Sequence, residues 1–219
     1  MPRRARLATG GLVYHVLNRG NARATLFEDE GDYAAFERVL GEALGRTPLE
    51  LFAWCLMPNH WHMVLRPAKG EDLPQFMRWL SVTHTQRWHA HHHTSGTGHL
   101  YQGRYKSFPV QDDLHFLIVC RYVQRNALRA GLVDRAGHWR WSSLWAGPTQ
   151  MGRPPARWPV QRPRDWIEFV NQPQTEAELH ALRQAVAKGR PFGQEDWESR
   201  MISDLALERT RREPGRPPK

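Results

Sequence analysis

The sequence predicts an α+β fold, namely a ferredoxin-like βαββαβ antiparallel sheet with an added helix and a helical C-terminal extension. Two observations support this prediction. Apolar periodicity follows the order strand, helix, strand, strand, helix, strand, an order that places both helices on one face of the sheet and leaves the other face free. A further helical segment follows the last strand directly, and two more lie near the C-terminus.

The first strand and helix are defined by apolar spacing and by turn residues. Residues 12–17 are apolar on both faces, which suits a central strand, and the turn at 18–21 ends it. The helix that follows begins at Asp29 or Asp32 as N-cap and stops at Gly45. We therefore expect this helix to cross the sheet between the first and second strands.

The second half of the pattern repeats the first. The second strand spans 49–55, and the turn Pro58-Asn59 returns the chain as the third strand of a hairpin. The second helix begins at Asp72, which together with Gln75 resembles a capping box. The fourth strand spans 105–111. These elements complete the predicted sheet.

The third strand carries two histidines, His60 and His62, inside an otherwise apolar run. Alternate side chains of a strand share a face, so both imidazoles point to one side and Trp61 to the other. Two neutral imidazoles on a rigid strand suit a divalent metal, but a catalytic metal site usually has three protein ligands. For the pair alone, an ordinary half-buried strand is the favoured interpretation, and only a third ligand at suitable spacing would overturn it.

The helix after the fourth strand offers that partner. Asp112-Asp113 caps it, it continues through about Ala127, and Tyr122 and Asn126 lie one turn apart on one face. If the helix docks over the histidine strand, Asn126 supplies an oxygen ligand and Tyr122 stands beside the metal as a nucleophile.

Composition indicates an intracellular binder of phosphate backbones. Thirty-one Lys and Arg against twenty-two Asp and Glu give 219 residues a net charge of +9, accompanied by ten tryptophans that can stack on bases. No stretch is long and apolar enough for a membrane span or a secretory signal, so we expect a cytoplasmic protein. Cys55 and Cys120 lie among apolar neighbours and are interpreted as buried thiols.

Five basic residues are candidates for contacts with DNA phosphates. Three lie in the basic N-terminal segment and two near the fourth strand: Arg3, Arg4, Arg6, Arg104 and Lys106. The alternative is that these residues only keep a basic protein soluble.

The rest of the chain divides into regions by composition. We expect one domain at 1–147, a linker rich in proline and arginine at 148–174, and a helical extension with a basic tail at 175–219. The extension contains the capping box Thr175-x-x-Glu178. The histidine tract at 89–93 stands at a predicted frayed helix end and is interpreted as solvated.

Several motifs together resemble the REP-associated tyrosine transposases, an IS200-like branch of the single-tyrosine HUH transposases. The motifs are His60-Trp61-His62 after Met57-Pro58-Asn59, the run Tyr101 to Ser107, Tyr122-x-x-x-Asn126 followed by Leu128 to Val133, Trp141-Ser142-Ser143, and Gly189 to Gly193 with Trp197. The resemblance covers nearly the whole chain. One departure is Ala127, where proline commonly follows the asparagine.

The resemblance implies a single-strand DNA endonuclease and strand transferase that acts on repetitive extragenic palindrome hairpins through a 5′-phosphotyrosine. Tyr122 would be the nucleophile, and His60, His62 and Asn126 would hold Mg²⁺ or Mn²⁺, although two imidazoles bind Zn²⁺ more tightly. We expect a monomer, associated with the nucleoid, that uses its own tyrosine. The alternatives are a hairpin-binding protein that does not cleave and an unrelated metallohydrolase.

Overall fold

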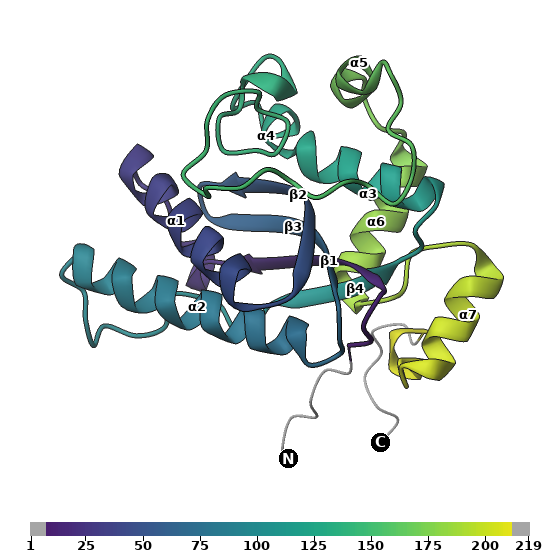
Figure 1. Cartoon of the computed structure of the whole chain (residues 1–219), viewed down its shortest axis with the longest axis horizontal. Coiled ribbons are helices and arrows are strands. Elements are labelled where there is room, and N and C mark those ends of the chain that lie inside the picture. The colour runs from purple at the N-terminus through teal and green to yellow at the C-terminus, as the bar shows by residue number, and fades with distance from the viewer. Residues whose placement is uncertain (1–7, 212–219) are drawn as a thin grey trace.

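The computed structural model describes residues 8–211 and contains one four-stranded antiparallel sheet in the order β2-β3-β1-β4 (Figure 1). The strands are β1 (Val13–Arg19), β2 (Leu49–Met57), β3 (His60–Pro67) and β4 (Lys106–Val110). Each neighbouring pair of strands is antiparallel. This pairing and the strand order are those of the ferredoxin-like arrangement. The predicted fold is confirmed, with strand ends that differ by up to two residues.

Helices α1 (Glu30–Arg46) and α2 (Asp72–His91) cover one face of the sheet (Figure 1). Their apolar stripes pack on the side chains of β1, β2 and β3 that point to this face, among them Val16, Leu56, Trp61, Met63 and Leu65. Trp61 is fully buried in this core, so the strand alternation predicted around the two histidines is correct.

The second face of the sheet is covered by α3 (Leu114–Gln124) and the short α4 (Asn126–Arg129). Their core includes Val64, Phe108, Phe116, Val119 and Val123, which are all buried. Asp113 caps α3 by accepting a hydrogen bond from the backbone N–H of His115, as predicted. The single helix predicted to continue through about Ala127 is instead interrupted at Arg125, whose ψ of −4° departs from helical geometry.

The described residues also form further helices outside the sheet and its two covering layers. They are η1 (Asn21–Arg23), η2 (Ala136–His138), α5 (Trp166–Asn171), α6 (Glu176–Lys188), α7 (Glu195–Asp204) and η3 (Glu208–Arg211). Phe192 bonds to the free edge of β4 on either side of Val110, since its N–H donates to Pro109 O and its carbonyl accepts from Gln111 N. This segment therefore covers part of the edge strand β4. An uncovered edge strand has free backbone groups that can pair with another chain.

Two helix starts differ from each other in how well they were predicted. The capping box of Thr175 and Glu178 is confirmed at the start of α6. The capping box predicted for Asp72 is wrong: Glu71 occupies the N-cap position, and the Asp72 carboxylate accepts from the N–H of Lys69 at 2.6 Å. The carboxylate is therefore turned toward the preceding loop and is not available to the helix N-terminus.

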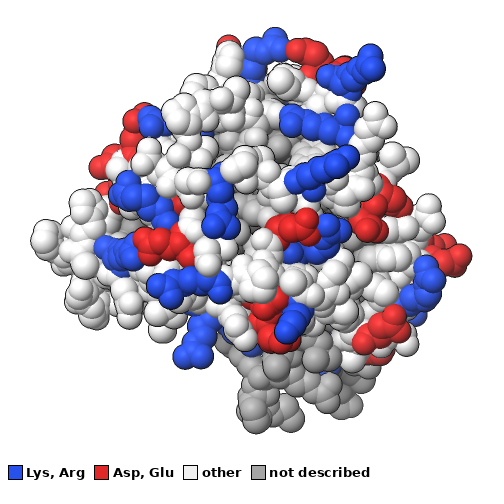
Figure 2. All heavy atoms as spheres, viewed as in Figure 1, with Lys and Arg blue, Asp and Glu red and all other residues white. Residues whose placement is uncertain are grey.

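Charges of both signs are mixed on the face seen in Figure 2, so the excess of basic residues is not gathered in one patch there. Cys55 and Cys120 are buried free thiols, as predicted. Within residues 8–211 no helix is both long and apolar enough to cross a membrane.

The predicted solvation of the histidine tract holds for His91 and His93, which are exposed, and is wrong for His89 and His92, which are partly buried. Helix α2 continues through His91, so most of the tract lies on or next to an ordered helix end. His92 forms an ion pair with Asp32, and His89 bonds to Thr94. The partners come from the start of α1 and from the following turn, neither of which the local sequence pattern could reveal.

Candidate active site

The two histidines lie at the start of β3, in the middle of the sheet. His60 pairs with Arg19 of β1 and Met57 of β2, and its ring centroid is 5.0 Å from that of His62. Both rings project to the face covered by α3, where His60 is partly buried and His62 is 4% exposed. The predicted pair of neighbouring imidazoles is present.

Hydrogen bonds orient each imidazole through its Nδ1 atom. His60 Nδ1 lies 2.6 Å from Asn59 Oδ1, and that amide is itself fixed because its nitrogen donates to Arg23 O. An amide oxygen only accepts, so Nδ1 carries the proton and Nε2 keeps its lone pair. Neither His60 Nε2 nor His62 Nε2 bonds to another group of residues 8–211.

His15 holds the second histidine. It is fully buried on β1, and its Nε2 lies 2.9 Å from His62 Nδ1. Burial lowers the pKa of His15 to about 3, so at neutral pH it is an uncharged partner. A neutral imidazole at this position can accept the Nδ1 proton of His62, which leaves His62 Nε2 with its lone pair.

Both strand histidines are uncharged at neutral pH. Burial, reinforced by the charges of Arg19 and Arg129, lowers the pKa of His60 to about 4. Burial is also the main cause that places the pKa of His62 well below its ordinary value. Because a metal binds the neutral form of imidazole, neither residue has to lose a proton before it can act as a ligand.

Tyr122 lies over this pair in the same chain. Its ring is nearly perpendicular to that of His62, with 5.8 Å between the centroids, and the residue is 8% exposed. The guanidinium carbon of Arg129 is 4.3 Å from the centre of the tyrosine ring on α3. The tyrosine is therefore enclosed between an imidazole and a fixed positive charge.

Asn126 approaches the site through the same arginine. Its Oδ1 accepts a hydrogen bond of 2.6 Å from Arg129 Nη2, while its buried Nδ2 has no partner among residues 8–211. The buried Nη1 atom of Arg129 likewise has no partner in this part of the chain. Buried polar groups usually have partners, so these two unpaired atoms mark a place where another polar group is expected to bind.

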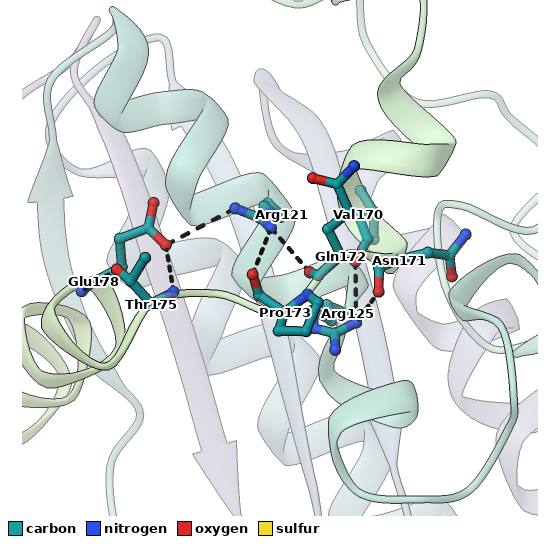
Figure 3. Close-up of polar contacts among 8 residues, drawn as sticks. All are labelled: Arg121, Arg125, Val170, Asn171, Gln172, Pro173, Thr175 and Glu178. Carbon is teal, nitrogen blue, oxygen red and sulfur yellow. Dashed lines mark hydrogen bonds and ion pairs between the residues drawn. The ribbon is translucent and has the colours of Figure 1, made fainter.

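Figure 3 shows how the helix interruption between Tyr122 and Asn126 is anchored. Arg125 Nη1 donates to the carbonyls of Val170 and Asn171, and Arg121 Nη2 donates to those of Gln172 and Pro173. The two arginines thus attach the helix that carries the tyrosine to the end of α5 and to the two residues after it.

A basic cleft opens beside the histidines. Its volume is about 260 Å³, and Arg19, Arg104 and Lys106 are among the residues that line it, with Val186 of α6. Since Arg19 is the strand partner of His60, the cleft adjoins the histidine pair. Two of the predicted DNA contacts therefore lie together near the candidate site, and the other three, Arg3, Arg4 and Arg6, fall outside the described residues.

Three residues of the site were missed in the sequence: His15, Arg19 and Arg129. The only available signal was the position of Arg129 in the run Leu128 to Val133. His15 and Arg19 reach the site through the register of β1 against β3, and a register between distant strands is not visible in local periodicity.

Comparison with known proteins identifies the family of the chain. A family model described as "Transposase IS200 like" matches residues 8–126. The REP-associated tyrosine transposase of Escherichia coli (strain K12) is 21% identical over 135 residues, which are 62% of this chain and 77% of the relative.

Solved structures give a similar result. The structure of a REP-associated tyrosine transposase bound to a REP hairpin has a TM-score of 0.53 at 20% identity, over 68% of this chain and 92% of that one. A transposase structure from Deinococcus radiodurans covers 60% of this chain and 92% of its own at 20% identity, with a TM-score of 0.39. The family resemblance read from the sequence motifs is confirmed.

Proposed function

The chain belongs to the family of IS200-like transposases, and on that premise we propose that it cleaves and rejoins single-stranded DNA at repetitive extragenic palindrome hairpins. One observation carries the proposal: the ring of Tyr122 lies over His62 of the same chain. A phenol next to two uncharged imidazoles is the arrangement needed for metal-assisted attack on a phosphodiester. The curated relative is named as a REP-associated tyrosine transposase, and the similar structure contains a REP hairpin, which supports the choice of substrate.

The residues of the site fit a divalent metal. His60 and His62 would each offer Nε2, and Asn126 would offer Oδ1 once Arg129 shares or releases it. With one amide oxygen, two imidazoles and phosphate oxygens as donors, Mg²⁺ or Mn²⁺ is the proposed ion, and Zn²⁺ is the tighter-binding alternative. When bound, the metal polarises the scissile phosphate and offsets the charge that develops in the transition state.

The residues of this chain then divide the reaction among them. The Tyr122 oxygen attacks phosphorus, the bond from phosphorus to the 3′ oxygen breaks, and the products are a 5′-phosphotyrosine and a free 3′-hydroxyl. The phosphotyrosine ester conserves the energy of the broken linkage, so rejoining requires no nucleotide cofactor. Arg129, whose Nη1 is buried and unpaired, is placed to donate to a phosphate oxygen.

DNA would reach the site along the cleft of Arg19, Arg104 and Lys106. Guanidinium and ammonium groups hold the phosphates there, and the N-terminal arginines Arg3, Arg4 and Arg6 are proposed to extend that contact. The domain division at residues 147 and 174 also remains a proposal. Because the proposed substrate is DNA, we propose a cytoplasmic protein that associates with the nucleoid. The position of Tyr122 over the histidines of its own chain supports a monomer that acts in cis.

The second candidate function is a hairpin-binding protein that does not cleave. It is favoured by the contact of Arg129 with the Asn126 oxygen, which leaves one proposed ligand engaged. An unrelated metallohydrolase is disfavoured by the family match and by the tyrosine beside the histidines.

End-labelled repeat hairpins distinguish the candidates. A 3′-labelled single strand incubated with the chain and Mn²⁺ should yield a covalent band that survives denaturation. The same strand labelled at its 5′ end should yield only a shorter free oligonucleotide. A strand that binds tightly but gives neither product identifies the non-cleaving alternative, and a covalent band with the 5′ label would reverse the proposed polarity.

A further inference from the structure

A second group of metal-ligating side chains lies where the first turn of α1 meets the last turn of α2. Asp32 is 5% exposed, and its two carboxylate oxygens have separate partners. One accepts from the N–H of Glu28 at 2.9 Å, and the other lies 2.9 Å from His92 Nε2. The carboxylate is therefore buried, fixed in orientation and turned toward the histidine tract.

The two histidines of this group are adjacent in the chain. His92 stacks on Trp88 with 4.1 Å between ring centroids, and Trp88 is fixed because its indole N–H donates to Leu26 O. His91 stands nearly perpendicular to His92, with centroids 5.1 Å apart. One ligand atom from each of Asp32, His91 and His92 lies within 4.8 Å of the other two.

We propose that Asp32, His91 and His92 bind one zinc-class divalent cation and so join α1 to α2. Bonds of about 2 Å from a tetrahedral ion connect donors that are roughly 3 to 4 Å apart, so small rotations of the exposed His91 would complete the site. Two imidazoles and one carboxylate form a donor set that selects zinc over magnesium or calcium, which prefer oxygen ligands.

The geometry leaves one coordination position open. Asp32 and His91 both line a cleft of about 300 Å³ that also contains His84, Arg38 and Arg87, so water can occupy that position. Zinc that binds only the folded state would stabilise the contact between the helices, by an amount that grows with the logarithm of the zinc concentration. The site uses no residue of the proposed active site, and it does not depend on the proposed DNA chemistry.

Zinc binding by the full chain without a purification tag tests the proposal. Equilibrium dialysis should show about one zinc ion fewer per chain for His91→Ala than for the wild type, because two donors are too few for a stable site. His91 is exposed, so this variant should melt at the same temperature as the wild type in EDTA. Zinc should raise the melting temperature of the wild type more than that of the variant.

His93→Ala is the matched control, since His93 belongs to the same tract but not to the group of three. It should retain the zinc stoichiometry and the thermal shift of the wild type. Equal zinc uptake by His91→Ala and the wild type would mean that Asp32 and His92 form only an ion pair. An equal loss in His91→Ala and His93→Ala would mean loose binding along the tract. Either result overturns the proposal, and loss of DNA cleavage in His60→Ala has no bearing on it.

Discussion

The phenolic oxygen of Tyr122 is the atom that the proposed reaction requires as its nucleophile. We predict that Tyr122→Phe abolishes the covalent band while hairpin affinity stays nearly unchanged, because the ring still packs against His62 and only the hydroxyl is lost. Gel shift and end-label cleavage assays measure the two quantities separately. Tyr33→Phe is the matched control, since Tyr33 is also a buried tyrosine but lies in the core on the other face of the sheet. Cleavage by Tyr122→Phe at the wild-type rate would remove Tyr122 from the mechanism.

The three proposed metal ligands should not be equivalent. His60→Ala and His62→Ala should each lose metal-dependent cleavage, because each removes one of only two imidazole ligands and a water molecule binds the metal more weakly than an oriented imidazole. Asn126→Ala should be milder, since a water molecule can replace one oxygen ligand. Titration of Mn²⁺ against the cleavage rate would show a higher metal requirement for Asn126→Ala. Wild-type cleavage that is indifferent to chelators would contradict all three assignments.

At the scale of elements, a buried arginine attaches α3 to the residues after α5, and an exposed ion pair joins Arg135 to α5. Arg121 is 5% exposed, donates to Gln172 O and Pro173 O, and lies 3.9 Å from the ring centre of Phe169 (Figure 3). Arg135, by contrast, reaches Glu168 in an exposed ion pair. Both contacts join the region around the tyrosine helix to α5 and the residues after it.

This contrast gives a stability prediction. Arg121→Met keeps the side-chain volume but leaves two carbonyls without donors, so it should lower the free energy of unfolding by about 1–3 kcal/mol. Arg135→Ala should change it by less than about 1 kcal/mol, because exposed ion pairs contribute little. Urea denaturation of the two variants provides the measurement. Equal effects would show that the buried hydrogen bonds are not what holds α5 in place.

For the whole molecule, buried neutral histidines predict acid sensitivity. Burial lowers the pKa of His84 to about 3, below its unfolded value of about 6.5. The unfolded state therefore binds more protons between these two values, so stability is complete above pH 6.5 and falls as the pH decreases toward 3. His84 alone would account for up to roughly 3 kcal/mol of this loss by pH 4, at 1.36 kcal/mol per pKa unit.

His84→Gln should flatten the pH dependence whatever it does to stability at pH 7. Urea denaturation from pH 4 to pH 8, in the presence of a chelator, measures how steeply the free energy of unfolding changes with pH. Identical slopes for the wild type and His84→Gln would show that His84 does not titrate differently in the two states.

DNA binding by the whole molecule should depend steeply on salt. Each phosphate contact with a single strand contributes roughly −0.7 to the slope of log affinity against log salt concentration, so Arg104→Gln with Lys106→Gln should flatten it by roughly 1.4. Removal of residues 3–6 should flatten it in the same way. Base preference should survive both changes, because phosphate contacts position DNA and do not read its sequence. An unchanged slope after the truncation would assign the N-terminal arginines to solubility alone.

Local features of this protein were determined by the sequence itself. Strand alternation put His60 and His62 on one face. The predicted approach of Tyr122 to Asn126 is present across the break between α3 and α4, where Arg129 contacts both residues. The helix N-caps at Asp113 and Thr175 were also predicted correctly. In each case the geometry follows from neighbouring φ and ψ angles, so a window of a few residues contains the information.

Tertiary structure alone decided which distant groups complete these sites. The pairing of β1 with β3 placed His15 against His62 and Arg19 beside His60, and the packing of α1 on α2 brought Asp32 to His92. The structure also interrupts the tyrosine helix at Arg125 and turns Asp72 away from its helix start. Contacts between distant residues depend on strand register and on packing across the whole core. Each contact competes with water and with the other partners that the fold brings within reach.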